Sequence, residues 1–144
     1  MVAIADGRTA TSVTMMIRAS STDGRYMHAI AHSADAGDTW GNASAVFVAG
    51  PTCQGSIGRD SAAPPGHVVL SAPAGSRAYL GRGDMVAYHL DESAPGAGGL
   101  TKKMTVWPQA AGYSDFAQLA SGPLLLLFEA GGNVYDEGIK ISPL

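Results

Sequence analysis

Residues 33–40, SADAGDTW, decide how this chain is expected to fold. The pattern S-x-D-x-G-x-T-W begins at Ser33 and ends at Trp40. The Asp35 carboxylate can accept backbone N–H groups across a turn, Gly37 supplies a positive φ, and the Trp40 ring can lie beneath the loop. We therefore expect an Asp-box hairpin, which joins two strands at the edge of a sheet and performs no chemistry.

Short strands are expected on both sides of this turn, along the whole chain. Nineteen glycines and eight prolines separate short apolar runs, and no window keeps apolar residues at helical spacing for three turns. The runs predicted to be strands are residues 13–18, 26–33, 45–48, 67–71, 84–90, 104–106, 116–119, 124–128 and 137–141. Such spacing is typical of β-propeller blades, which have four strands in about 40 to 50 residues. The 144 residues therefore predict an all-β fold of about three blades, too few for a closed ring.

Length, net charge, apolar runs and cysteine count exclude several classes of protein. The chain is long enough for one core, so we expect a single domain over residues 1–144. Its net charge is −3, and scattered lysines and arginines leave no basic face for nucleic acid. The longest apolar run, residues 124–128, is far shorter than the ~20 residues of a membrane span. Cys53 is alone and no zinc spacing occurs, so no disulfide, metal or cofactor is expected.

The start of the chain gives no indication of cellular location. The first residues, MVAIADGR, do not show a basic segment followed by an apolar one, so we expect no signal peptide here. The sequence predicts no particular compartment.

Residues 111–129, AGYSDFAQLASGPLLLLFE, indicate a second hairpin with polar groups at its mouth. Tyr113 stands between two small residues, a Ser-Gly-Pro turn follows, and five apolar residues lead to Glu129. A carboxylate directly after such a run costs several kcal/mol in desolvation, roughly, unless a cation or hydrogen bonds meet it. We therefore expect Glu129 to have a partner, and arginine is the natural candidate.

Several motifs, taken in chain order, together resemble the exo-α-sialidases (neuraminidases), a family of glycoside hydrolases with six-bladed propellers. The resemblance covers nearly the whole chain and corresponds to the C-terminal part of the catalytic propeller. The motifs are MMIR ending at Arg18, SADAGDTW, CQGS at residues 53–56, RGDMVAYHL starting at Arg82, GYSDFAQL with Tyr113, LLLLFE ending at Glu129, and YDEGI at residues 135–139.

The resemblance implies a role for each matching residue. Arg18 and Arg82 look like two of the three arginines that clamp the sialic acid carboxylate, which guanidinium groups can bind in a bidentate manner. Arg77 competes with Arg82 for this role, and we favour Arg82 because it precedes an alternating strand. Tyr113 looks like the catalytic nucleophile, since sialidases use tyrosine where other glycosidases use a carboxylate.

Two further residues receive roles on the same basis. Glu129 looks like the residue that orients the family's first arginine. Gln54, in the CQGS motif, either lines the pocket or makes a purely structural hydrogen bond.

The chain departs from the family pattern at three functional positions. A phenol with a pKa of ~10 needs a carboxylate base beside it. The resemblance implies a base about 16 residues before Arg18, but that position is Val2, and the nearby Asp6 belongs to a turn. The general acid and the first arginine, with its F/Y-R-x-P motif, are also missing. We therefore expect a portion of an exo-α-sialidase that is inactive in isolation, while the whole enzyme would release sialic acid from sialylated glycans, gangliosides included, with retention.

Two alternatives stay open on the sequence alone. Asp-boxes also occur in unrelated propellers, so the chain could be a non-catalytic module that binds carbohydrate or protein. In that case Arg18, Arg82 and Tyr113 should not cluster. Alternatively, an adjoining chain could supply the missing N-terminal blades and complete the site.

Overall fold

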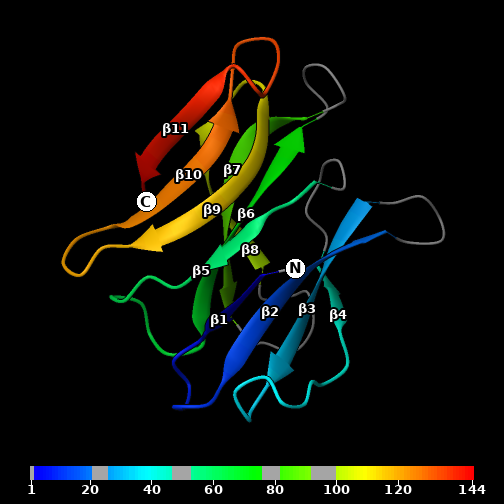
Figure 1. Cartoon of the computed structure of the whole chain (residues 1–144), viewed down its shortest axis with the longest axis vertical. Coiled ribbons are helices and arrows are strands. Elements are labelled where there is room, and N and C mark those ends of the chain that lie inside the picture. Colours follow the sequence, from blue (N-terminus) through cyan, green and yellow to red (C-terminus); the bar gives the residue numbers. More distant parts are fainter. Residues whose placement is uncertain (1, 21–25, 47–52, 76–81, 92–99) are drawn as a thin grey trace.

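The computed structural model describes residues 2–20, 26–46, 53–75, 82–91 and 100–144, and its regular elements within these ranges are all strands (Figure 1). In chain order they are β1 (Val2–Ala5), β2 (Val13–Ser20), β3 (Tyr26–Ser33), β4 (Ser44–Val46), β5 (Ser56–Gly58), β6 (His67–Gly75), β7 (Gly83–Asp91), β8 (Leu100–Trp107), β9 (Ala111–Gln118), β10 (Leu124–Ala130) and β11 (Gly138–Pro143). The all-β prediction is confirmed.

The strands form three antiparallel sheets that follow the chain. The first sheet has the order β1-β2-β3-β4, the second β5-β6-β7-β8, and the third β9-β10-β11. The first strands of successive sheets, β1, β5 and β9, lie against one another, with β5 in the middle (Figure 1). Each sheet therefore runs outward from a common line, as propeller blades do, and the described sheets do not close a ring.

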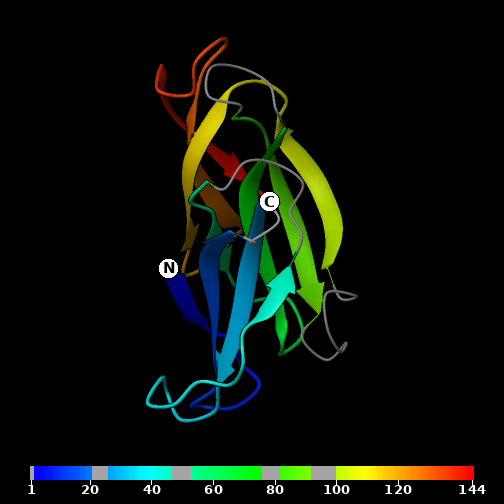
Figure 2. The ribbon, with the colours of Figure 1, turned by 90° about the vertical axis from the view of Figure 1, so that its right-hand side faces the viewer.

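Two layers of apolar side chains hold the three sheets together. The β5–β8 sheet packs against both of the others, and Figure 2 shows its long strands side by side. The first layer contains Met16 and Ile30 of the first sheet and Leu70 of the second, and the other layer contains Met85, Leu126 and Phe128. Burying each large side chain of this kind stabilises the fold by roughly 1.5–3 kcal/mol. The second sheet packs on both faces, so its two long central strands are almost continuously buried.

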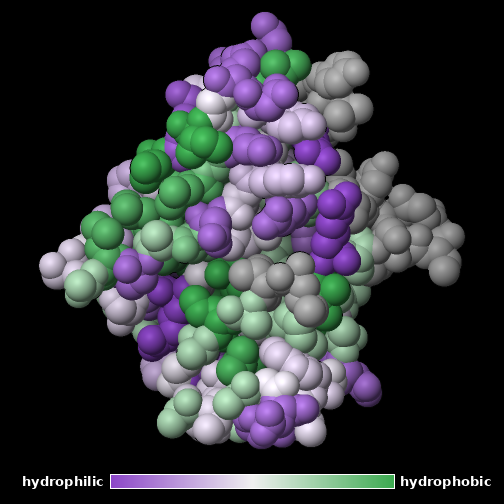
Figure 3. All heavy atoms as spheres, in the orientation of Figure 1, coloured by the Kyte–Doolittle hydropathy of each residue, from purple (hydrophilic) through white to green (hydrophobic). Residues whose placement is uncertain are grey.

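The third sheet has one covered and one open face. Along β10 the side chains alternate, with Leu124, Leu126 and Phe128 buried and Leu125 and Leu127 only half-buried. Because strand side chains alternate between faces, Leu125 and Leu127 lie on the outer face of the sheet, which continues onto the neighbouring strand β11. There Ile139 and Ile141 are 67% and 62% exposed. Figure 3 shows hydrophobic surface over this part of the molecule.

Several strands differ from the prediction, for physical reasons. β1 and β5 were not predicted, because runs of four and three residues are too short to show periodicity. β9 begins at Ala111, although residues 116–119 were predicted, so Tyr113 lies within the strand. Pairing with β10 overrides the low strand propensity of Gly112 and the serine after Tyr113. Of the predicted strand 45–48, residues 47 and 48 lie outside the described part.

The turn after β3 is held by the side chains of Ser33 and Asp35. The Asp35 carboxylate accepts the Thr39 backbone N–H at 2.9 Å and the Thr39 hydroxyl at 2.6 Å. Ser33 Oγ donates to Asp35 at 2.7 Å and accepts the Gly37 N–H at 2.9 Å. These hydrogen bonds from Thr39 and Ser33 lower the pKa of Asp35 to about 2. Gly37 has φ +98°, and Trp40, 37% exposed, lies against it.

Candidate functional site

The sequence-predicted site residues lie at one end of the strands. Arg18 is near the end of β2, Gln54 precedes β5, Arg82 directly precedes β7, Tyr113 is the third residue of β9, and Glu129 is near the end of β10. In the first sheet β2 ends where β1 starts, and in the third β10 ends where β9 starts. In the second, β5 and β7 start at the same end because β6 runs antiparallel between them. The topology therefore gathers polar side chains from separate elements.

Arg82 and Tyr113 are in direct contact. The guanidinium carbon of Arg82 is 5.2 Å from the centroid of the Tyr113 ring. Burial lowers the pKa of Arg82, but the Cys53 thiol, Tyr135 and Tyr113 outweigh it and the net pKa is raised. Tyr113 itself is 40% exposed. The site therefore holds a permanent cation against an accessible phenol.

Glu129 meets the backbone of the tyrosine segment. Its Oε2 atom accepts the backbone N–H of Tyr113 at 3.0 Å, and the side chain is only half-buried. The predicted need for a partner is met by this hydrogen bond, which leaves the second carboxylate oxygen for other contacts. Gly112 permits the arrangement, because a Cβ there would collide with Glu129 Oε2 and would lie 2.8 Å from the Tyr135 ring.

The positive charges of Arg18 and Arg82 both affect the pKa of the Cys53 thiol. Burial raises the pKa of the Cys53 thiol, Arg82 and Arg18 act to lower it, and Glu129 adds to the increase. Three of the predicted site residues thus act electrostatically on one fully buried side chain. Arg18 is exposed and pairs with His28 across β2 and β3. His28 is buried, and its Nε2 atom is 3.0 Å from the Cys53 carbonyl oxygen, which ties the CQGS segment to the first sheet.

A hollow of about 270 Å³ opens beside these residues. Its lining consists of Gln54, Tyr113, Ser114, Asp115, Leu127, Phe128, Glu129 and Ile139. The volume is close to the ~300 Å³ at which small-molecule sites begin, and the walls combine apolar side chains with a phenol, an amide and carboxylates. Of the two expectations for Gln54, pocket lining is the one that this hollow favours.

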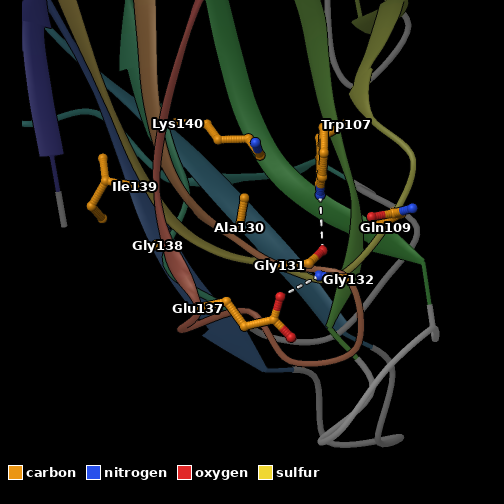
Figure 4. A pocket seen from close by; sticks show the side chains of 9 residues that line it. All are labelled: Trp107, Gln109, Ala130, Gly131, Gly132, Glu137, Gly138, Ile139 and Lys140. Carbon is orange, nitrogen blue, oxygen red and sulfur yellow. Dashed lines mark hydrogen bonds between the residues drawn. The ribbon is translucent and has the colours of Figure 1, made fainter.

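A second hollow, of about 390 Å³, lies under the turn between β10 and β11 (Figure 4). Glu137 accepts the backbone N–H of Gly132 at 2.7 Å and those of the next two residues at 3.3 Å. Trp107 donates its indole N–H to the Gly131 carbonyl at 3.2 Å, and Lys140 lies 4.4 Å from the Trp107 ring. These polar groups already hold the turn in place, so the larger hollow is the weaker candidate for a ligand site.

Asp6 is not part of the candidate site. It is fully buried and accepts hydrogen bonds from Arg8, Ser12 and Thr14. Burial acts to raise the pKa of Asp6, but the hydrogen bonds from Arg8, Ser12 and Thr14 together hold it well below its ordinary value. This carboxylate stabilises the turn after β1, the turn to which the sequence assigned it.

Sequence reasoning assigned no role in the site to Tyr135, which the fold places beside Arg82. Tyr135, between β10 and β11, has its ring centroid 4.7 Å from the Arg82 guanidinium carbon. The YDEGI motif marked this residue, but only the folded chain brings it to Arg82. Arg77, the competitor of Arg82, lies outside the described residues.

The described residues contain no group of three or more His, Cys, Asp or Glu side chains arranged to hold a metal ion. Within the same ranges, no helix is long and apolar enough to cross a membrane.

Comparison with known proteins places the fold. No family's sequence model matches the chain, and no curated protein matches it by sequence. The crystal structure of the intramolecular trans-sialidase from Ruminococcus gnavus in complex with oseltamivir carboxylate is similar, at 21% identity and a TM-score of 0.51. The similarity covers 89% of this chain and 30% of that one, so the chain spans less than a third of that protein's length. The chain has a sialidase-like all-β fold, which forms part of a propeller.

Proposed function

We propose that this chain is the C-terminal portion of an exo-α-sialidase propeller and carries part of the site that binds a terminal sialic acid. In this proposal Arg18 and Arg82 bind the carboxylate of the sugar, Tyr113 is the nucleophile, and Gln54 lines the pocket. Glu129 orients an arginine from outside this chain. The contact between the Arg82 guanidinium and the Tyr113 ring, 5.2 Å from carbon to centroid, is the observation that carries it.

The chemistry of sialic acid explains why these residue types belong together. The sugar has a carboxylate on its anomeric carbon, which a guanidinium group binds through two parallel hydrogen bonds. The same negative charge repels an aspartate or glutamate nucleophile, whereas a phenol approaches as a neutral group. The Tyr113 oxygen would bond to the anomeric carbon as the glycosidic bond breaks, and water would then release the sugar with retention.

The proposed chemistry needs groups that this sequence does not supply. A base must take the phenolic proton, an acid must protonate the departing glycosidic oxygen, and a third arginine would complete the clamp. We therefore expect the isolated chain to bind sialic acid weakly and to release no product from a fluorogenic sialoside. Turnover by the wild-type chain that is lost in Tyr113→Phe would contradict the expectation that this sequence supplies no base, acid or third arginine.

Binding tests the proposal directly. We expect the methyl α-glycoside of N-acetylneuraminic acid to shift backbone amide resonances in a saturable NMR titration. Arg82→Ala should weaken this binding at least about tenfold, because a charge-assisted bidentate pair is lost. Lys140→Ala is the matched control, since it removes a cation beside the other hollow and should leave the affinity unchanged. Equal affinities for wild type and Arg82→Ala would refute the proposal.

The alternative is a non-catalytic propeller module that binds carbohydrate or protein. It predicts no clustering of Arg18, Arg82 and Tyr113. The contact between Arg82 and Tyr113 supports the sialidase proposal instead. The same titration separates the two, because a general carbohydrate module should bind a neutral methyl galactoside as well as the sialoside.

A further inference from the structure

Arg82 has aromatic rings from two different elements beside it. Its guanidinium carbon is 5.2 Å from the centroid of Tyr113 on β9 and 4.7 Å from that of Tyr135, in the turn after β10. The Tyr135 ring is therefore the nearer of the two. Cation–π attraction acts at this range, below about 6 Å.

The Tyr135 ring is braced from two sides. Its Cδ2 atom would be 2.8 Å from a Cβ on Gly112, so ring and backbone pack as closely as a glycine allows. The residues just before it are fixed by Glu137, which accepts backbone N–H groups from Gly132, Asn133 and Val134. Glu137 lies on the far side of Tyr135 in sequence, so the turn is tied across this residue. The ring position is thus set by the fold before any ligand arrives.

A braced ring changes what Arg82 can do. A free arginine side chain loses rotamer entropy when it is fixed, and a ligand must supply the corresponding free energy. Aromatic contacts engage the flat face of a guanidinium group and leave its N–H edge available. An arginine held this way is already oriented when a carboxylate binds to it.

We propose that Tyr135 is a positioning residue for Arg82. Its ring holds the guanidinium group so that the N–H edge can pair with a ligand carboxylate beside Tyr113. The identity of that ligand rests on the proposed function, but the positioning of Arg82 does not. The aromatic ring carries the effect, so phenylalanine at position 135 preserves it and leucine removes it.

The first measurement needs no ligand. Ring currents shift the Nε–H resonance of an arginine that stacks on aromatic rings, and this resonance is resolved in a ¹H–¹⁵N spectrum of the full chain. Its assignment to Arg82 follows from its loss in Arg82→Lys. In Tyr135→Leu we expect the resonance to move toward the position of a free arginine, while Tyr135→Phe keeps it in place. A backbone amide spectrum that stays dispersed in both variants establishes that they fold.

The second measurement is the affinity for the methyl α-glycoside of N-acetylneuraminic acid. Tyr135→Leu should raise the Kd by about 2- to 30-fold, which corresponds to loss of one cation–π contact, and Tyr135→Phe should stay within about twofold of wild type. Lys140→Ala is the matched control, because it removes a cation–π pair, that of Lys140 with Trp107, but keeps the hydrogen bond from Trp107 to Gly131, and it should leave both the Kd and the Arg82 resonance unchanged.

The outcomes separate this inference from the proposed function. An Arg82 resonance that does not move in Tyr135→Leu overturns the inference, whatever the ligand data show. A wild-type chain that does not bind the sialoside overturns the proposed function, while the resonance shift still decides the role of Tyr135. If the Arg82 resonance moves in Tyr135→Leu but not in Tyr135→Phe, and Tyr135→Leu also shows the expected loss of affinity, the inference and the proposed function are both supported.

Discussion

Replacing Gly112 by alanine tests how tightly the site is packed. The new Cβ would collide with Glu129 Oε2 and would come 2.8 Å from Tyr135 Cδ2, so both side chains must move. Moving Glu129 breaks its hydrogen bond to the Tyr113 N–H, 3.0 Å long. A hydrogen bond to a charged group contributes about 1.5–3 kcal/mol, and we take about 1 kcal/mol because this carboxylate is partly in water.

Two further contributions enter the Gly112→Ala estimate. Displacing a packed ring adds about 1–3 kcal/mol. The φ of Gly112 lies outside the left-handed region, so alanine also reduces the entropy of the unfolded chain and returns about 0.4–1 kcal/mol. The sum is a loss of about 1–3.6 kcal/mol in the free energy of unfolding.

Urea denaturation followed by tryptophan fluorescence measures this loss. Gly138→Ala is the matched control, because a Cβ at that position meets nothing within 4 Å. We expect Gly138→Ala to be neutral or slightly stabilising and Gly112→Ala to lower the urea midpoint clearly. If the two variants unfold at the same urea concentration, the packing of Glu129 and Tyr135 around Gly112 is not as described.

Three further predictions concern the fold. Leu126→Ala should cost about 2–5 kcal/mol in urea denaturation, because Leu126 is fully buried between two sheets, whereas Leu125→Ala on the outer face should cost less than half as much; equal losses would reverse the assigned faces. The pKa of Asp6 is lowered by folding, so its stabilising contribution is complete above its unfolded pKa of about 4 and is lost as the pH falls below that value. The urea midpoint should therefore fall between pH 5 and pH 3, and Asp6→Asn should reduce this fall; an unchanged pH profile in the variant would contradict the account. Ile141→Lys should reduce the binding of a hydrophobic dye with little loss of stability, since Ile141 is 62% exposed, and unchanged dye binding would place the open apolar surface elsewhere.

Much of the fold is local in origin and could be predicted. The turn after β3 depends on contacts within residues 33–40, where Asp35, Ser33 and Thr39 bind one another and the intervening backbone. Apolar alternation or a continuous apolar run in the sequence predicts the long strands, such as β10 and β6. β1 and β5 carry no such signal, because each forms only when a longer neighbouring strand pairs with it.

The candidate site was predictable only in part. Motif order pointed to Arg82 and Tyr113, which the fold brings into contact. One oxygen of Glu129 accepts the Tyr113 backbone N–H, which the sequence did not predict, because Gly112 lets the strand approach the carboxylate. An arginine partner for Glu129 stays a prediction. The role of Tyr135 depends on the path of the turn after β10, which no local pattern specifies.

The most direct test of the central claim compares two ligands that differ by one charge. N-acetylneuraminic acid methyl α-glycoside carries the free carboxylate, and its methyl ester presents the same ring without that charge. If Arg82 beside Tyr113 binds the carboxylate, the wild-type chain should bind the acid at least about tenfold more tightly than the ester, and Arg82→Ala should reduce this difference, with only the contribution of Arg18 left. Equal binding of acid and ester by the wild-type chain would contradict the account.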